Sequence, residues 1–266
     1  MAVWLATGGS RVRGLVFGAL ALGAASSAQA GAWPMPKGKG QVITRYERQT
    51  AEEVFGPDGA GVPIEPRWDE SAVAFVEYGL TDRLTLQGKL GYARGADAFT
   101  GYEGAAPAEL GVRWNAWNGR GAVISVYGGA ISPGEGENAI YVSRQPSDGE
   151  LEARVLVGRS GRWRGRTAFV DAQAARLWRI GAADETRLDL TVGVDVTRNW
   201  LLLAQTYAGE TDASGDGLRP GWANVEVSAV RRFRGGWRAQ LGYRTAVYGR
   251  DTTVGAGPVV AVWRRF

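Results

Sequence analysis

The stretch ETRLDLTVGVDVT, residues 185–197, decides the fold class of this chain. Apolar side chains occupy every second position from Leu188 to Val196, and charged residues such as Arg187 and Asp189 stand between them. Successive side chains of an extended strand point to opposite faces, so this alternation predicts a β-strand with one apolar and one polar face. Periodicity alone leaves open which of the two faces meets water.

The same alternation recurs along the chain and predicts about 12 strands. They cover residues 41–48, 71–80, 84–93, 108–117, 122–130, 150–159, 166–178, 185–197, 200–208, 222–232, 237–249 and 254–266. Tight turns and long loops alternate between them, and the main predicted loops are residues 49–70, 94–107, 131–149 and 209–221. In an up-and-down barrel every second connection lies on the same side of the membrane. The rhythm predicts an all-β fold, an antiparallel up-and-down transmembrane β-barrel with both termini on the periplasmic side.

One of the short connections carries a strong hairpin signal. The pair Asn118–Gly119 lies between two alternating segments. Tight hairpin turns need residues that tolerate positive φ, and Asn-Gly satisfies this requirement well. We therefore expect the turn at residues 118–121.

The tryptophans and tyrosines indicate which face meets lipid. Trp114, Trp117, Trp163, Trp200, Trp237 and Trp263 lie near short turns or the C-terminus, and Tyr92, Tyr207, Tyr248, Trp178 and Trp222 lie at the opposite strand ends. Two belts of amphipathic rings are typical of barrels that cross a membrane, with the apolar face outward. The alternative is a soluble periplasmic β-protein whose aromatic residues close the ends of a barrel or sandwich.

Residues 1–30 have the organisation of a secretory signal peptide. Arg11 and Arg13 form a positive n-region, residues 14–25 form an apolar segment, and a small-residue cleavage site ends at Ala30. The apolar segment is shorter than the roughly twenty residues that a membrane-spanning helix needs. Export followed by cleavage after Ala30 is the expectation.

The remaining residues, 31–266, are expected to form one outer-membrane barrel domain. No later stretch reaches the length of apolar sequence that would predict a transmembrane helix. The stretch WPMPKGKG, residues 33–40, either caps the periplasmic mouth or serves as a linker to the first strand. A linker is the simpler expectation.

Arginines gather in the short turns. They are Arg83, Arg120, Arg162, Arg164, Arg198, Arg231, Arg232 and Arg234, with Arg264 and Arg265 at the C-terminal end. At a membrane surface, each would gain about 1 kcal/mol beside anionic headgroups, and we expect them to face lipid. Nucleic acid is not an expected partner, because acidic strands interrupt the basic residues.

The C-terminus and one hairpin resemble known outer-membrane proteins. Val260, Val262 and Phe266 match the terminal signal by which bacterial outer-membrane proteins are assembled, and Arg264 departs from it. The hairpin YGLTDRLTL, residues 78–86, resembles a turn in small porin-like barrels, including those associated with the meta pathway of phenol degradation. The resemblance implies a bacterial outer-membrane location, contacts with outer-membrane lipid and the barrel assembly machinery, and passage of small or hydrophobic compounds.

The chain contains neither histidine nor cysteine. Barrel enzymes of the outer membrane generally use histidine as a base near neutral pH, and no such triad can be built here. Metal ligation by imidazole or thiolate is equally impossible, and oxygen ligands for Ca²⁺ are present without a recognisable binding loop. We therefore expect no catalytic residues, no metal site and no cofactor.

Charged residues share the polar face of the predicted strands. They are Arg45, Glu47, Glu77, Lys89, Glu109, Arg113, Glu152, Arg154, Asp171, Arg187, Asp189, Asp195, Glu226, Arg238 and Arg244. On a lipid-exposed face each would cost about 2–4 kcal/mol near the bilayer midplane, so we expect them to line the lumen. Rings of charge can serve an open pore or fill a narrow interior, and both remain possible.

These features favour a passive channel or uptake pore for small solutes of unknown identity. The alternative is a non-conducting structural or surface-interaction barrel that uses the first and third predicted loops, residues 49–70 and 131–149, as its binding surface.

Overall fold

A computed structural model describes residues 31–135, 147–214 and 217–266. The strands are β1 (Gly40–Phe55), β2 (Gly61–Gly79), β3 (Leu84–Ala96), β4 (Gly101–Gly119), β5 (Ala122–Ile131), β6 (Glu150–Trp163), β7 (Arg166–Arg179), β8 (Glu185–Asp195), β9 (Trp200–Thr211), β10 (Gly221–Arg232), β11 (Trp237–Arg250), β12 (Thr252–Thr253) and β13 (Ala256–Arg265). A single 3₁₀ turn, η1 (Arg234–Gly236), precedes β11. Among the described residues, no helix is long and apolar enough to cross a membrane.

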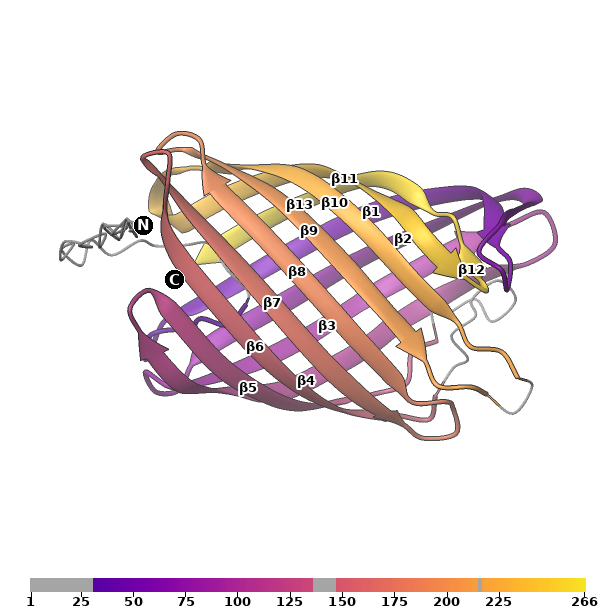
Figure 1. Ribbon diagram of the computed structural model, residues 1–266, viewed down its shortest axis with the longest axis horizontal. Coiled ribbons are helices and arrows are strands. Elements are labelled where there is room, and N and C mark those ends of the chain that lie inside the picture. The colour runs from indigo at the N-terminus through magenta and orange to yellow at the C-terminus, as the bar shows by residue number, and fades with distance from the viewer. Residues whose placement is uncertain (1–30, 136–146, 215–216) are drawn as a thin grey trace, which may run out of the picture.

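The strands form one closed antiparallel barrel (Figure 1). Each long strand pairs with the next along the chain, and β1 pairs with both β2 and β13, which closes the sheet. At the seam Gly40 N donates to Phe266 O at 2.9 Å, and Phe266 N donates to Gly40 O at 3.0 Å. The two-residue β12 only extends the pairing of β1. The prediction of a twelve-stranded transmembrane-type barrel is confirmed.

The short turns and the first strand's start lie at one end of the barrel, which we call the turn end. The longer connections lie at the other, the loop end (Figure 1). In outer-membrane barrels the short turns face the periplasm.

The turn between β4 and β5 consists of Arg120 and Gly121, whose φ angles are 52° and 75°. The prediction of a turn at residues 118–121 is therefore wrong by two residues, because β4 continues through Asn118 and Gly119 after a bulge.

Two predicted long loops are mostly strand. Pairing of β1 with β2 continues to Phe55 and Gly61, so residues 49–70 form an extended hairpin with a five-residue tip at 56–60. Likewise β3 and β4 pair up to Ala96 and Gly101, within the predicted loop 94–107. The backbone N–H and C=O groups of these extended hairpins are thereby satisfied within the sheet. The third predicted loop, 131–149, falls largely outside the described residues, as do residues 215–216 of the predicted loop 209–221.

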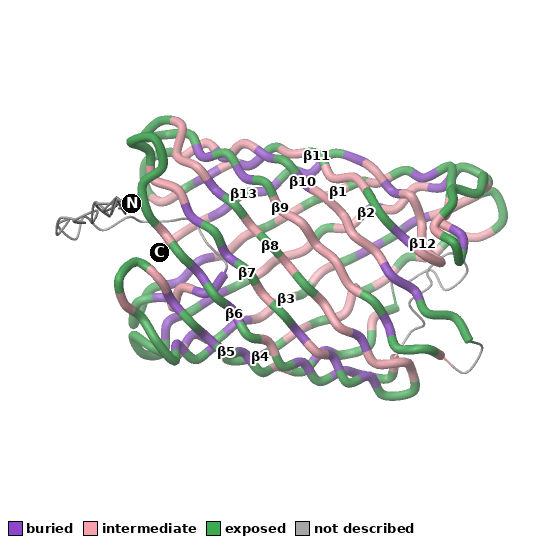
Figure 2. Tube along the Cα trace, viewed as in Figure 1, coloured by how far each residue is buried: buried purple, intermediate pink, exposed green. Residues whose placement is uncertain are grey.

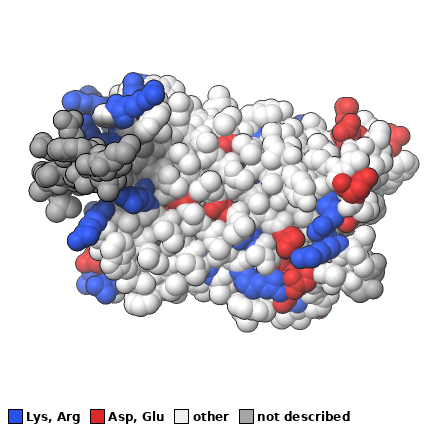
Figure 3. All heavy atoms as spheres, viewed as in Figure 1, with Lys and Arg blue, Asp and Glu red and all other residues white. Residues whose placement is uncertain are grey.

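The outer face of the barrel is apolar and its inner face is polar. Leu90, Leu110 and Leu241 are each more than 60 % exposed, whereas Gln41, Glu77 and Glu226 have no exposed surface. Buried or half-buried residues alternate with exposed ones along much of the strands (Figure 2), and the middle of the face drawn in Figure 3 carries few charges. This inverted pattern is the one expected of strands surrounded by lipid.

The aromatic belt at the turn end lacks one predicted member. Trp114, Trp163 and Trp237 are about half exposed on the outside, as expected, but Trp263 is only 6 % exposed and points into the barrel. Its Nε1 donates to Gln240 Oε1 at 3.1 Å. The parity of β13 explains the difference, because Val260 and Val262 take the outer face and Trp263 must take the inner one.

Candidate functional site: the barrel lumen

The predicted lumenal charges lie on the inner face, where most of them are paired. In mid-barrel Arg45 reaches from β1 to Glu226 on β10 at 2.7 Å and to Glu47 at 2.6 Å. Arg244 on β11 adds a contact to Glu47 at 3.5 Å. Only β13 and β11 separate β1 from β10 in the sheet, so this network lies over one side of the inner wall and projects into the lumen.

A second set of polar contacts lines the opposite wall. Lys89 lies 3.2 Å from Glu109, which also accepts a hydrogen bond from the Tyr127 hydroxyl at 2.7 Å. Arg154 pairs with Glu152 and donates to Gln173 Oε1 at 2.8 Å. Every charge here has a partner on the same or a neighbouring strand, so this part of the lumen is polar without a large net charge.

The most deeply buried ion pair joins Glu77 on β2 to Arg113 on β4. The Arg113 Nη1 and Glu77 Oε1 atoms are 2.8 Å apart, and both side chains are at most 1 % exposed. Gln87 Nε2 also donates to Glu77 Oε1 at 2.8 Å. Removing one member of such a pair leaves an uncompensated charge in the interior, which is strongly destabilising.

The remaining candidates differ in their surroundings. Arg187 pairs with Glu185, and Asp195 lies 2.5 Å from Arg232. Asp189 shares the inner parity of these residues on β8, but its side chain makes no hydrogen bond or ion pair with the described residues. Asp171 binds the N-terminal segment, and Arg238 is buried at the turn end without a carboxylate partner among the described residues.

The segment before β1 enters the lumen from the turn end. We call residues 31–37 the plug. Ala32 N donates to Asp171 Oδ2 at 2.7 Å, and the Ser125 hydroxyl donates to Ala32 O at 2.6 Å. Arg113 Nη2 donates to Trp33 O at 2.7 Å. The expectation that residues 33–40 form a linker is wrong, because inner-face side chains satisfy the backbone of this segment inside the barrel.

The plug continues toward the wall of the barrel before β1 begins. Met35 is 7 % exposed, and its N donates to the Thr85 hydroxyl at 2.9 Å. The Trp33 indole lies against Gly158 of β6, where an added Cβ would come within 2.6 Å of the ring. Only glycine leaves room for the indole at this position. The plug therefore packs closely against the inner wall of the barrel.

An apolar cluster lies beside the plug. Phe169, Leu201, Leu203, Val230, Ala261 and Trp263 are buried together, and Trp33 and Ile43 pack against them. The rings of Trp33 and Phe169 meet edge to face, with centroids 6.1 Å apart. This part of the inner face is apolar although it belongs to the polar side of the strands.

Two cavities meet at Phe169. One, of about 420 Å³, lies in mid-barrel and is lined by Arg45, Lys89 and Arg244 together with the apolar cluster. The other, of about 760 Å³, opens at the turn end. Phe169 lines both, so this ring lies at the boundary between the two cavities. Hydrophobic constrictions of this kind regulate permeation in channels.

Comparison with known proteins places the fold. An outer-membrane channel of Pseudomonas putida F1 aligns with a TM-score of 0.70 and 15% identity, over 90% of this chain and 100% of that chain. The chain has the fold of outer-membrane channels and porins. A second similar structure, the KdgM porin, aligns with a TM-score of 0.51 and 8% identity, over 84% of this chain and 99% of that chain. No family model and no curated protein matches the sequence.

These similarities agree with the resemblance to small porin-like barrels that the hairpin at residues 78–86 indicated. The translocator domain of the autotransporter NalP from Neisseria meningitidis also aligns, with a TM-score of 0.50 and 12% identity, over 87% of this chain and 90% of that chain. The shared feature of all three is the barrel, which is the fold that the prediction of a bacterial outer-membrane protein requires.

Sequence reasoning did not find the plug or the apolar cluster. The run Leu201–Leu203 was a usable signal, because three successive leucines must place at least one side chain on the inner face. Trp33 gave no comparable signal, since a lone tryptophan before the first strand fits a belt, a linker or a plug equally well. The short-turn arginines were expected to face headgroups, yet Arg162, Arg198 and Arg232 line the turn-end cavity.

Proposed function

We propose that this protein is a passive outer-membrane channel for small solutes, restricted at its turn end by the plug and the apolar cluster. The observation that carries the proposal is that Phe169 lines both lumenal cavities. The barrel wall supplies a polar interior on each side of a short apolar zone. Movement of the plug away from Phe169 would join the two cavities into one path.

The mixed charges of the lumen support a selective role for the wide section. The Arg45, Glu47 and Glu226 network projects into the lumen from one side of the wall, so it would limit the size of a solute before the solute reaches the apolar cluster. Lys89, Arg244 and Glu47 line the same cavity and offer hydrogen-bonding groups of both charges to a polar solute. The substrate class follows from both zones, since a permeant has to tolerate a polar entry and an apolar passage.

The proposal includes export and assembly. Residues 1–30, which lie outside the described residues, would act as a signal peptide, and cleavage would leave Gly31 as the first residue of the plug. Val260, Val262 and Phe266 all face outward and are 44–53 % exposed, as a signal read by the barrel assembly machinery requires. Arg264 stacks on the Trp237 ring at 5.1 Å, which accommodates a charge on this outer face. Enzymatic activity is not part of the proposal, because the chain lacks histidine.

Single-channel recording in planar lipid bilayers tests the proposal. We expect small conductance steps from the mature protein and larger steps, by severalfold, from a variant without residues 31–37. Heat-modifiable migration on gels checks that both barrels are folded. If folded protein of both kinds leaves the bilayer silent, the proposal is wrong and the non-conducting barrel is supported.

A further inference from the structure

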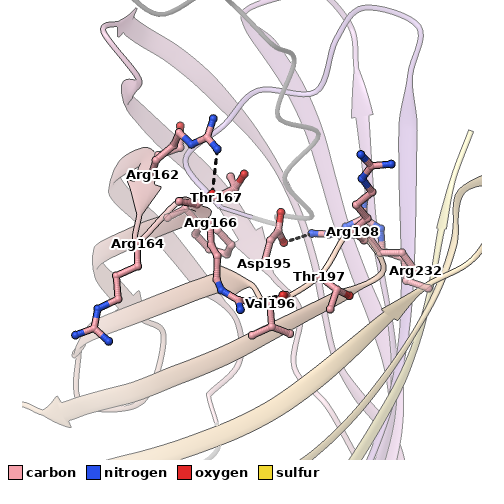
Figure 4. Close-up of a pocket in the computed structure, with 13 residues that line it drawn as sticks. Arg162, Arg164, Arg166, Thr167, Asp195, Val196, Thr197, Arg198 and Arg232 are labelled. Carbon is pink, nitrogen blue, oxygen red and sulfur yellow. Dashed lines mark hydrogen bonds and ion pairs between the residues drawn. The ribbon is translucent and has the colours of Figure 1, made fainter. Parts of the chain in front are cut away.

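The turn-end cavity is a basic vestibule of unusual composition. We use this name for the space of about 760 Å³ between the β6–β7 turn, the β8–β9 turn and the adjacent ends of β10 and β11. Six arginines line it, namely Arg162, Arg164, Arg166, Arg198, Arg232 and Arg238. Asp195 is the one carboxylate of that lining. Figure 4 shows Arg162 and Arg166 on one side of this space and Arg198 and Arg232 on the other, while the end of Arg164 extends away from them.

Several of these arginines are held by backbone atoms, which fixes the shape of the vestibule. Arg162 Nη2 donates to Gly165 O at 3.0 Å within the β6–β7 turn. Arg166 donates to Val196 O and so connects that turn to the β8–β9 turn. Carbonyl partners neutralise no charge, so the vestibule keeps its positive potential. Asp195 compensates Arg232 alone, at 2.5 Å.

Arg238 is the side chain whose surroundings indicate an anionic ligand. It is 7 % exposed, lines the vestibule and makes no ion pair or hydrogen bond with the described residues. Its Nη1 is fully buried without a hydrogen-bond partner there, and its guanidinium lies 5.8 Å from the Trp263 ring centroid. Buried guanidinium groups are normally paired, because leaving a buried charge unpaired is costly. Arg232 Nε is likewise buried without a partner among the described residues.

The vestibule also offers neutral donors for an oxygen-rich group. Thr197 Oγ1 already accepts hydrogen bonds from Asn199 N and Trp200 N, at 3.3 and 3.1 Å. Its hydroxyl proton is free to donate to a further acceptor. Guanidinium forks and hydroxyls together match the geometry of phosphate and carboxylate oxygens.

We propose that the basic vestibule is a binding site for the phosphate or carboxylate group of a small anionic solute, with Arg238 as its central contact. The ligand is a free solute and not a lipid headgroup, because Phe169 and Arg238 place the site on the inner side of the barrel wall. The inference rests on the proposed function in one respect, namely that the ligand is a solute that passes through the channel. At the periplasmic exit such a site would draw anions past the apolar cluster.

Calorimetry with inorganic phosphate tests the site without requiring transport. The mature protein in detergent micelles at low ionic strength is titrated with phosphate, and we expect saturable binding and a higher melting temperature. Arg238→Gln should weaken binding at least tenfold. Arg219→Gln, which removes a half-exposed arginine at the loop end, is the matched control and should bind like the parent.

A second variant and a second environment complete the test. Arg162→Gln combined with Arg198→Gln removes two charges from the exposed rim and should weaken binding about threefold even if Arg238→Gln fails to fold. Nanodiscs with phosphatidylglycerol should bind phosphate as well as nanodiscs with phosphatidylcholine. Loss of binding in phosphatidylglycerol would assign the site to a headgroup and overturn the proposal, as would equal affinity in Arg238→Gln and Arg219→Gln.

The two proposals can fail separately. Saturable phosphate binding by a barrel that never conducts would reject the channel and keep the site. Conducting steps without phosphate binding would reject the site and keep the channel.

Discussion

The two halves of the lumen are built from the same strands but filled in different ways. From mid-barrel toward the loop end, charged side chains such as Lys89 and Glu109 pair within a polar and partly solvent-exposed space. Toward the turn end, the plug and the apolar cluster fill the interior, and Glu77 and Arg113 are completely enclosed. The alternation of polar and apolar residues along a strand therefore predicts which side chains face the lumen. What those side chains contact depends on their depth along the barrel axis.

The largest expected difference between the halves concerns their ion pairs. Arg113→Met should lower the free energy of unfolding by about 3–5 kcal/mol, because it leaves the Glu77 carboxylate buried and unpaired. Lys89→Met, at a side chain that is 36 % exposed, should lower it by about 1 kcal/mol or less. Urea unfolding of both variants in detergent measures the contrast.

Glu77→Gln added to Arg113→Met is the control for that contrast. It removes the unpaired charge and should recover part of the loss. Equal destabilisation by the two single substitutions would show that the halves have similar polarity, contrary to the description above.

The next comparison concerns the apolar cluster. Phe169→Ala should raise single-channel conductance by about twofold or more, since it removes the ring that lines both cavities. Val170→Ala, at the adjacent residue facing lipid, should leave conductance unchanged. A Phe169→Ala barrel that conducts like the parent would place the restriction in the plug alone.

The smallest effect is expected at the loop end, outside the membrane-spanning strands. A hydrogen bond from Arg176 lowers the pKa of Asp212 below its ordinary value. The favourable interaction is therefore present above the unfolded-state pKa and is lost as pH falls through the lower folded-state pKa. Carboxyl NMR titration should show Arg176→Ala returning the pKa of Asp212 toward about 3.9. An unchanged titration would mean that solvent screens the pair completely.

Much of the fold could be predicted from the sequence, because lipid imposes a strict rule on outward residues. Leu188, Leu190 and Val192 had to share one face, and the same rule located the outward Val260 and Val262. Residues 49–70 lack a clear alternation of apolar and polar side chains. The sequence therefore predicts a loop there, although these residues continue the β1–β2 pairing.

The candidate site was less accessible to sequence reasoning. Inner-face parity named Arg113 and Asp171, but nothing in their spacing indicated that both bind the backbone of residues 31–33. Such contacts depend on where a segment without periodicity comes to rest. Arg238 was named as a lumenal charge, whereas the lack of a carboxylate beside it among the described residues could be seen only in three dimensions.

The seam between Gly40 and Phe266 has a consequence for the order of assembly. The plug is covalently continuous with β1, and it turns into the barrel only a few residues before that seam. Ala32 and Trp33 contact β4, β5 and β7, which lie on the far side of the ring from the junction of β1 with β13. The segment can be laid across the open, curved sheet more easily than threaded into a finished cylinder. Residues 31–37 would then serve as an internal template, around which the last strand completes the circle.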